Sequence, residues 1–248
     1  MSSVVQTKAD KVDNLEKKPE KCPCGCGKEP HLHDQVKNPG TNIGISQALK
    51  ENMYPGDTHL DHPWWIGNGS LEAHHLISSS SMKSKEWAEI CLLFGYDINE
   101  KLNGVMLPSM MDLACHLKMP RHRGGHPKGY NKGFENDLES LSDNIKKYCN
   151  NPQDLIDTMR EISEDVLNQV ADFTLLLNNK GTDLSPNGCG CMGRTSINGT
   201  KNKNSYCAIN KRNHSHDPDF IKKIQDFNTR FKKSKTIIGL KKELTIGE

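Results

Sequence analysis

Four segments of the chain carry apolar residues at helical spacing. They are residues 84–95, 134–148, 151–181 and 217–231. In the first segment Ser84 is a suitable N-terminal cap, and Gly95 is typical of a helix end. The third begins with Asn151 as a cap and Pro152 at the first helical position, which proline favours. Each apolar stripe predicts a helix that packs against a core, and none of them indicates catalysis.

Strand patterns are few and short. The best are "LEAHHLI" at residues 71–77 and "GVMLP" at residues 104–108, both bounded by turn-forming residues. The predicted fold class is therefore α+β, mostly helical, with a small β element in the middle of the chain.

Composition limits what such a fold can bury. Hydrophobic residues make up 34% of the 248 residues, which is low for a globular protein. A core this small often needs additional cross-links such as bound metals. The formal net charge is +2, so any surface for nucleic acid must be local. The polar N-terminus lacks the apolar region of a signal peptide and no apolar run reaches the roughly 18 residues of a membrane span, so we expect synthesis in the cytoplasm.

Cysteines and histidines gather in two groups near the ends of the chain. The N-terminal group is Cys22, Cys24, Cys26, His31 and His33, and the C-terminal group is Cys189, Cys191, Cys207, His214 and His216. An odd number of thiols in each group argues against self-contained disulfides. Thiolate and imidazole are the ligands that tetrahedral zinc prefers, so we expect structural zinc in both flanks, with disulfides, a redox role or no role as the alternatives. The other three cysteines (Cys91, Cys115 and Cys149) are interpreted as small buried apolar residues.

The stretch "LEAHHLISSSS" places two histidines side by side in the first predicted strand. Neighbouring side chains of a strand point to opposite faces, so His74 and His75 should meet different surroundings. Two further motifs follow downstream, "GYDINEKLNGVMLP" and "HRGGHPKGYNKG". With "AHHLI", and in this order, the segment from Leu71 to about Glu135 resembles the AHH family of the HNH and endonuclease VII nuclease superfamily, whose core is a ββα-metal finger.

The resemblance implies metal-dependent cleavage of phosphodiesters, commonly by a polymorphic toxin that acts between bacteria. The implied substrate is DNA, or RNA as an alternative. The implied partners are a cognate immunity protein and a specialised secretion system that delivers the toxin into the cytoplasm of a target cell.

Phosphodiester hydrolysis needs a base that deprotonates water and a cation that neutralises charge at the phosphate. His75 is the candidate base because imidazole titrates near neutral pH. Asn103, on the opposing strand, is expected to hold His75 through its side-chain carbonyl. His74 would turn the other way, toward one divalent metal, Mg²⁺ or Zn²⁺.

The two further metal ligands are expected to be His122 and His126, which share one face if their segment is helical. The glycines between them and the proline after His126 weaken that helix, and His116 is the substitute for His122. Arg121 and Arg123 are candidates to grip phosphate and stabilise the phosphorane, although a solvated basic loop is an equal alternative.

The predicted division of the chain follows from these assignments. It comprises a disordered polar arm (1–20), a Cys/His-rich N-terminal segment (21–70), the nuclease core (71–150), a long amphipathic helix (151–181) and a Cys/His-rich C-terminal segment with a terminal helix (182–248). A non-catalytic zinc-binding adaptor or nucleic-acid-binding protein is the rival hypothesis. A zinc deaminase is disfavoured because H-x-E followed by P-C-x-x-C does not occur.

Overall fold

The computed structural model describes residues 21–110, 113–114, 117, 119–122, 124–127, 129–172, 174–175, 177 and 243–248. Its α-helices are α1 (Ser46–Met53), α2 (Lys85–Phe94), α4 (Glu135–Asp143) and α5 (Pro152–Ala171). Short 3₁₀ helices are η1 (Pro55–Asp61), η2 (Lys101–Asn103), η3 (Asn131–Gly133) and η4 (Ile145–Tyr148). Among the described residues, no helix is long and apolar enough to cross a membrane.

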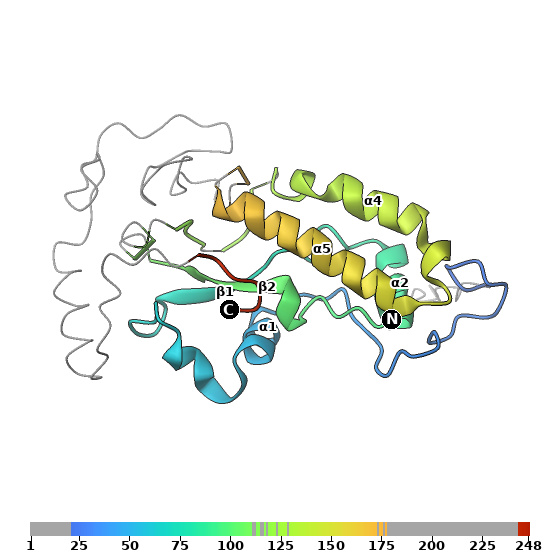
Figure 1. Cartoon of the computed structure of the whole chain (residues 1–248), viewed down its shortest axis with the longest axis horizontal. Coiled ribbons are helices and arrows are strands. Elements are labelled where there is room, and N and C mark those ends of the chain that lie inside the picture. Colours follow the sequence, from blue (N-terminus) through green and yellow to red (C-terminus); the bar gives the residue numbers. More distant parts are fainter. Residues whose placement is uncertain are drawn as a thin grey trace, which may run out of the picture.

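The two predicted strands form the sheet. β1 (Leu71–His75) pairs antiparallel with β2 (Gly104–Pro108), so that His74 lies opposite Val105. Residues 243–248 lie alongside β2, and the Met106 amide donates to the main-chain oxygen of Glu248 at 2.7 Å. Figure 1 shows this C-terminal segment, in red, beside β2. The prediction of a mostly helical α+β fold with a small sheet is confirmed.

The sheet has apolar cover on both faces. Leu49 and Met53 of α1 pack against Ala73 and Met106 on one face. On the other face, Val105 and Leu107 join the main core, to which α2, α4 and α5 all contribute. Figure 1 shows α5 running the length of this core beside α4. Alternation along β1 therefore sends His74 toward the main core and His75 toward the side of α1.

The helix over 84–95 is confirmed. The Ser84 hydroxyl accepts from the Trp87 amide at 3.1 Å, and Gly95 ends α2 in the left-handed conformation (φ 80°). The helix predicted over 134–148 is instead broken at Asn144 into α4 and η4. Asn144 leaves ideal helical dihedrals (φ −103°, ψ 15°), and its side chain donates to the Ser140 carbonyl at 2.7 Å.

The helix predicted to stop near Gly181 ends earlier. α5 stops at Ala171, because the Asp172 carboxylate accepts from the amide of Thr174 at 2.9 Å and from its hydroxyl at 2.6 Å. This local turn competes with continued helical hydrogen bonding. The fourth predicted helix, 217–231, lies outside the described residues.

Candidate active site

Three histidine side chains lie close together, one from β1 and two from the segment after β2. The side-chain nitrogens of His74, His122 and His126 that could hold a metal lie within 4.8 Å of one another. The ring centroid of His74 is 4.5 Å from that of His122 and 4.8 Å from that of His126. Close approach of three imidazoles suits a shared cation, since neutral imidazole is a common metal ligand.

No helix face brings His122 and His126 together. Over the described residues from 119 to 127 the backbone is not helical, and Gly124 takes a left-handed conformation (φ 83°). The His122 amide donates to the Pro108 carbonyl at 2.9 Å, which ties this segment to the end of β2. The expectation that a helix aligns the two histidines is therefore wrong, although the loop still places them side by side. His116 lies outside the described residues.

His75 is held by a different asparagine from the one predicted. Its Nε2 lies 3.1 Å from the side-chain oxygen of Asn99. The Asn99 amide nitrogen donates to the Ile43 carbonyl at 2.9 Å and to the Asp97 carboxylate at 3.0 Å, which identifies the atom facing His75 as the oxygen. His75 therefore donates from Nε2 and keeps the lone pair on Nδ1.

Asn103 serves as an anchor for the chain around β1 and β2. Its side-chain oxygen accepts from the Ile77 amide (2.8 Å) and the Ser163 hydroxyl (3.0 Å). Its amide nitrogen donates to the carbonyls of Ile77 (3.0 Å) and Ile98 (2.8 Å). The expected bond from Asn103 to His75 is thus a wrong assignment, because both ends of this fully buried amide are committed to other groups.

Residues 62–172 match the AHH family, described as a nuclease family of the HNH/ENDO VII superfamily with conserved AHH. The conserved triplet corresponds to Ala73, His74 and His75 of this chain. This segment belongs to the AHH nuclease family. The protein is accordingly an HNH/ENDO VII superfamily nuclease, a phosphodiester hydrolase, and the family implies dependence on a metal. Comparisons with curated proteins and with solved structures found no match.

The three converging histidines of the AHH nuclease fit a metal. The Nδ1 atoms of His74, His122 and His126 are buried without a hydrogen-bond partner among the described residues. Unpaired buried polar atoms are costly, and a bound cation would satisfy all three at once. Burial lowers the pKa of His122 to about 3 and that of His126 to about 4, so both rings are neutral and able to ligate near pH 7.

Tyr130 fixes the form in which His74 meets this site. The Tyr130 hydroxyl donates to the Leu76 carbonyl at 2.8 Å, so its oxygen accepts the Nε2–H of His74 at 2.9 Å. His74 then carries its lone pair on Nδ1, the nitrogen that has no hydrogen-bond partner among the described residues. Burial also lowers the pKa of His74 well below its ordinary value, with smaller contributions from His122 and His126.

A cleft of about 360 Å³ opens beside His75 and His126. Its other lining residues are Gly44, Ser46, Ser78, Ser79, Ser80, Gly125, Pro127 and Asn131. The serine run therefore forms one wall of the cleft. The Ser78 hydroxyl donates to the side-chain oxygen of Asn131 at 2.8 Å, while the amide nitrogen of Asn131 donates to the Ser80 hydroxyl at 2.9 Å.

Among the predicted arginines and the C-terminal cysteines and histidines, only Arg121 lies in the described part of the chain. Arg121 donates from Nε to the Ser109 carbonyl at 2.7 Å, which fixes its side chain to the segment after β2. Arg123 lies outside the described residues. The same is true of the whole C-terminal group, namely Cys189, Cys191, Cys207, His214 and His216.

The N-terminal group lies together, and a further cysteine joins it. Cys22, Cys24, Cys26, His31 and His33 form overlapping sets that could hold a metal. The interpretation of Cys149 as a simple buried apolar residue is wrong, because its sulfur belongs to one of these sets. Cys91 is fully buried as expected, and Cys115 lies outside the described residues.

Sequence reasoning missed Asn99 and Tyr130. Asn99 lies in the same motif as Asn103, and the spacing alone does not show which amide meets His75. For Tyr130 the one available signal is chemical, since a tyrosine buried beside a histidine-rich loop needs a partner for its hydroxyl.

Proposed function

We propose that the protein is a metal-dependent endonuclease that cleaves DNA and acts as an antibacterial toxin, with His75 as general base. One observation carries the chemistry: three imidazole nitrogens without a hydrogen-bond partner among the described residues cluster together, and one of these histidines, His126, lines a cleft with His75. Phosphodiester hydrolysis needs a bound cation and a general base. The neutral histidines on one side of β1 could hold the cation, and His75 on the other side could act as the base.

His75 is prepared to accept a proton. Burial lowers its pKa, while the hydrogen bond that His75 donates to Asn99 and the charge of Asp97 act in the opposite direction. A neutral ring that donates from Nε2 can take a proton from water only at Nδ1. Asn99 thereby acts as a positioning residue, since it holds the ring and selects the nitrogen that works as base.

His74, His122 and His126 would hold the divalent ion, Mg²⁺ or Zn²⁺. When bound, such an ion neutralises charge on the phosphate and on the leaving oxygen. The donor set is all imidazole, which favours Zn²⁺ and other transition metals over Mg²⁺. Tyr130 keeps His74 in the tautomer that can ligate.

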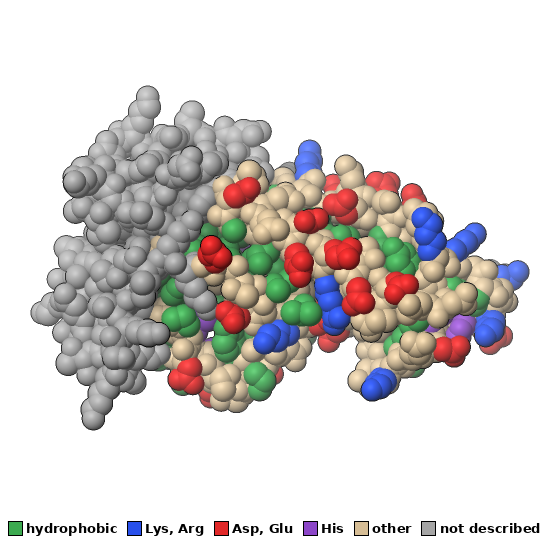
Figure 2. All heavy atoms as spheres, viewed as in Figure 1, with side chains coloured by type: hydrophobic (Ala, Val, Ile, Leu, Met, Phe, Trp, Pro, Cys, Tyr) green, Lys and Arg blue, Asp and Glu red, His purple; other side chains and the backbone are tan. Residues whose placement is uncertain are grey.

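The charge distribution supports a nucleic-acid site at the cleft. None of the described residues that line it is acidic, and its hydroxyls and amides can contact phosphate. Figure 2 shows acidic side chains spread over the face formed by α4 and α5, where a polyanion would be repelled. Arg121 and Arg123 are proposed to contact phosphate near His122.

The biological role is proposed from the family resemblance alone. A toxin of this kind would be exported by a specialised secretion system into a target cell, and its producer would need a cognate immunity protein. We also propose structural zinc in both flanks, holding the segments 21–70 and 182–248 around the nuclease core at 71–150 and the helix within 151–181.

The test is cleavage of supercoiled plasmid and of structured RNA by purified protein, across Mg²⁺, Mn²⁺, Ni²⁺ and Zn²⁺ and with a chelator. The proposal predicts nicking and linearisation of the plasmid that depends on added metal. Cleavage of RNA with the plasmid left intact would overturn the assignment of DNA as substrate. Intact DNA and RNA under every condition would overturn the nuclease chemistry.

A further inference from the structure

The N-terminal cysteines and histidines meet at the end of the molecule where α5 begins. Figure 1 shows residues 21–40, in blue, at the opposite end from β1 and β2. Cys22 and Cys24 are buried within the main core cluster, to which Ile145 also belongs. Gly25 lies against Lys146, where an added Cβ would come within 2.8 Å of its side chain. The segment is thus packed closely on η4.

Backbone conformation directs alternate cysteines toward one point. In an extended strand, the side chains of a C-x-C-x-C segment would share a face but stay about 7 Å apart. Here Gly25 and Gly27 take left-handed conformations (φ 71° and 79°), and the Gly25 amide donates to the Cys22 carbonyl at 2.9 Å. Glycine allows both bends at little cost. The bends gather the sulfurs of Cys22, Cys24 and Cys26.

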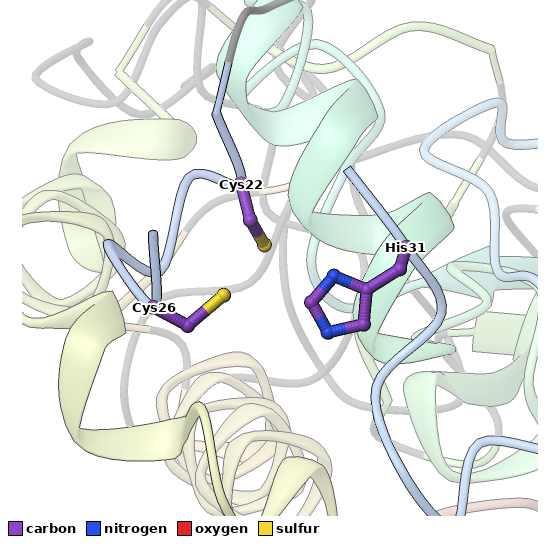
Figure 3. Close-up of side chains that lie close together, drawn as sticks. All are labelled: Cys22, Cys26 and His31. Atoms are coloured by element: carbon purple, nitrogen blue, oxygen red, sulfur yellow. The ribbon is translucent and has the colours of Figure 1, made fainter. Parts of the chain in front are cut away.

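Three overlapping sets of potential ligands share these thiols. Within each set the ligand atoms lie within 4.8 Å of one another, and the sets are Cys22 with Cys26 and His31, Cys22 with Cys24 and His33, and Cys24 with Cys26 and Cys149. Figure 3 shows the sulfurs of Cys22 and Cys26 and the ring of His31 turned toward a common space. Every pair drawn from the three N-terminal cysteines is therefore within reach of a single ion.

A histidine lies beside the sulfur of Cys22. His33, almost fully buried, places Nε2 3.4 Å from this sulfur. An imidazole N–H in this position would stabilise the anionic sulfur of a metal–thiolate site.

Cys149 is the only one of these ligands that comes from outside residues 21–33. It directly follows η4 and stands three residues before α5. Its Cα is 5.5 Å from that of Cys24, and their sulfurs are at bonding distance. A disulfide here would use two thiols and leave Cys22, Cys26 and two imidazoles as the remaining donors, whereas an ion that also binds Cys24 and Cys149 would use all four thiols.

We propose a zinc site in which Cys149 completes the set formed by Cys22, Cys24 and Cys26, so that the ion fastens the N-terminal segment to the junction between η4 and α5. Each thiol would release its proton on binding, and no oxidant is needed. His31 and His33 surround the sulfurs. The site is separate from the proposed catalytic histidines and does not depend on nuclease activity.

The test is alkylation of each cysteine, resolved by peptide mass spectrometry, in purified full-length protein kept in a phosphine reductant. The proposal predicts that Cys22, Cys24, Cys26 and Cys149 react slowly, and that a zinc chelator raises all four rates together by at least tenfold. Cys91 is the internal control, since it is fully buried in α2 and should stay unreactive with or without chelator.

Two outcomes would overturn the proposal. A cross-linked Cys24–Cys149 peptide in protein purified without reductant, together with alkylation of the reduced protein that is insensitive to the chelator, would show a disulfide in place of the ion. Chelator-dependent protection of the three N-terminal cysteines without Cys149 would show a site that is local to residues 21–33.

A matched pair of variants gives an independent readout. Cys149→Ser should release zinc to a chromophoric chelator at least tenfold faster than wild type, while Cys91→Ser should release it at the wild-type rate. Equal release from Cys149→Ser and wild type would also overturn the proposal. The alkylation pattern of wild type decides the matter if Cys149→Ser fails to fold.

Discussion

Asn103 offers a quantitative test of how the strand pair is held. Asn103→Ala removes four side-chain hydrogen bonds, two of them to Ile77 and one each to Ile98 and Ser163. The side chain is fully buried, so the groups left behind lose their partners without gaining full access to water. At about 1 kcal/mol for each bond, the expected loss is about 4 kcal/mol of unfolding free energy.

This loss is large compared with typical domain stabilities of about 5–15 kcal/mol. With a urea dependence of about 2 kcal/mol per molar, the unfolding midpoint should fall by about 2 M. The measurement is urea unfolding of both proteins, followed by circular dichroism at the same metal concentration. Asn144→Ala is the matched control, because that asparagine makes one exposed side-chain bond and should shift the midpoint by less than about 0.5 M.

The opposite pattern would refute the anchor role. If Asn103→Ala unfolds at the wild-type urea concentration but loses more than about a hundredfold in cleavage rate, Asn103 acts on the reacting groups and not on the fold. The structure predicts loss of stability first, with activity falling as the folded fraction falls.

Three further substitutions probe other parts of the structure. Tyr130→Phe keeps the ring but removes the hydroxyl that holds His74, so metal affinity measured by calorimetry should fall about 10–100-fold, and unchanged affinity would contradict that role. Asn99→Ala should lower kcat about 10–100-fold with KM within a few-fold in plasmid-cleavage kinetics, whereas a change in KM alone would argue against positioning of the base. Gly40→Ala places a Cβ against the carbonyl oxygen of Tyr96, so thermal unfolding should show a loss of about 3 kcal/mol or more, and wild-type stability would contradict this packing.

The sequence supported prediction best where local chemistry decides the structure. The cap at Ser84 and the terminator at Gly95 define α2 correctly because each acts within one helical turn. Alternation in "AHH" correctly separated the surroundings of His74 and His75, since a strand has a fixed period of two. In contrast, the end of α5 depends on one turn at Asp172, which competes with an apolar pattern that continues beyond it.

Contacts between segments that are distant in the sequence could not be predicted from local sequence patterns. Asn99 and Asn103 are both asparagines close to β2 in the sequence. Their different roles depend on contacts with distant segments, since Asn99 donates to the carbonyl of Ile43 and Asn103 donates to that of Ile77. Cys149 lies more than a hundred residues from Cys24, and no periodicity or spacing connects them. The roles proposed for His122 and His126 similarly depend on the loop path after β2, which their four-residue spacing does not specify.

His75 is proposed as the base of a metal-dependent nuclease, and the rate of plasmid cleavage by His75→Ala at saturating metal tests this role. His59→Ala is the control at a buried histidine outside the cluster. We expect a loss of at least about a hundredfold for His75→Ala, with His59→Ala close to wild type. Cleavage by folded His75→Ala at the wild-type rate would contradict the role of His75 as base.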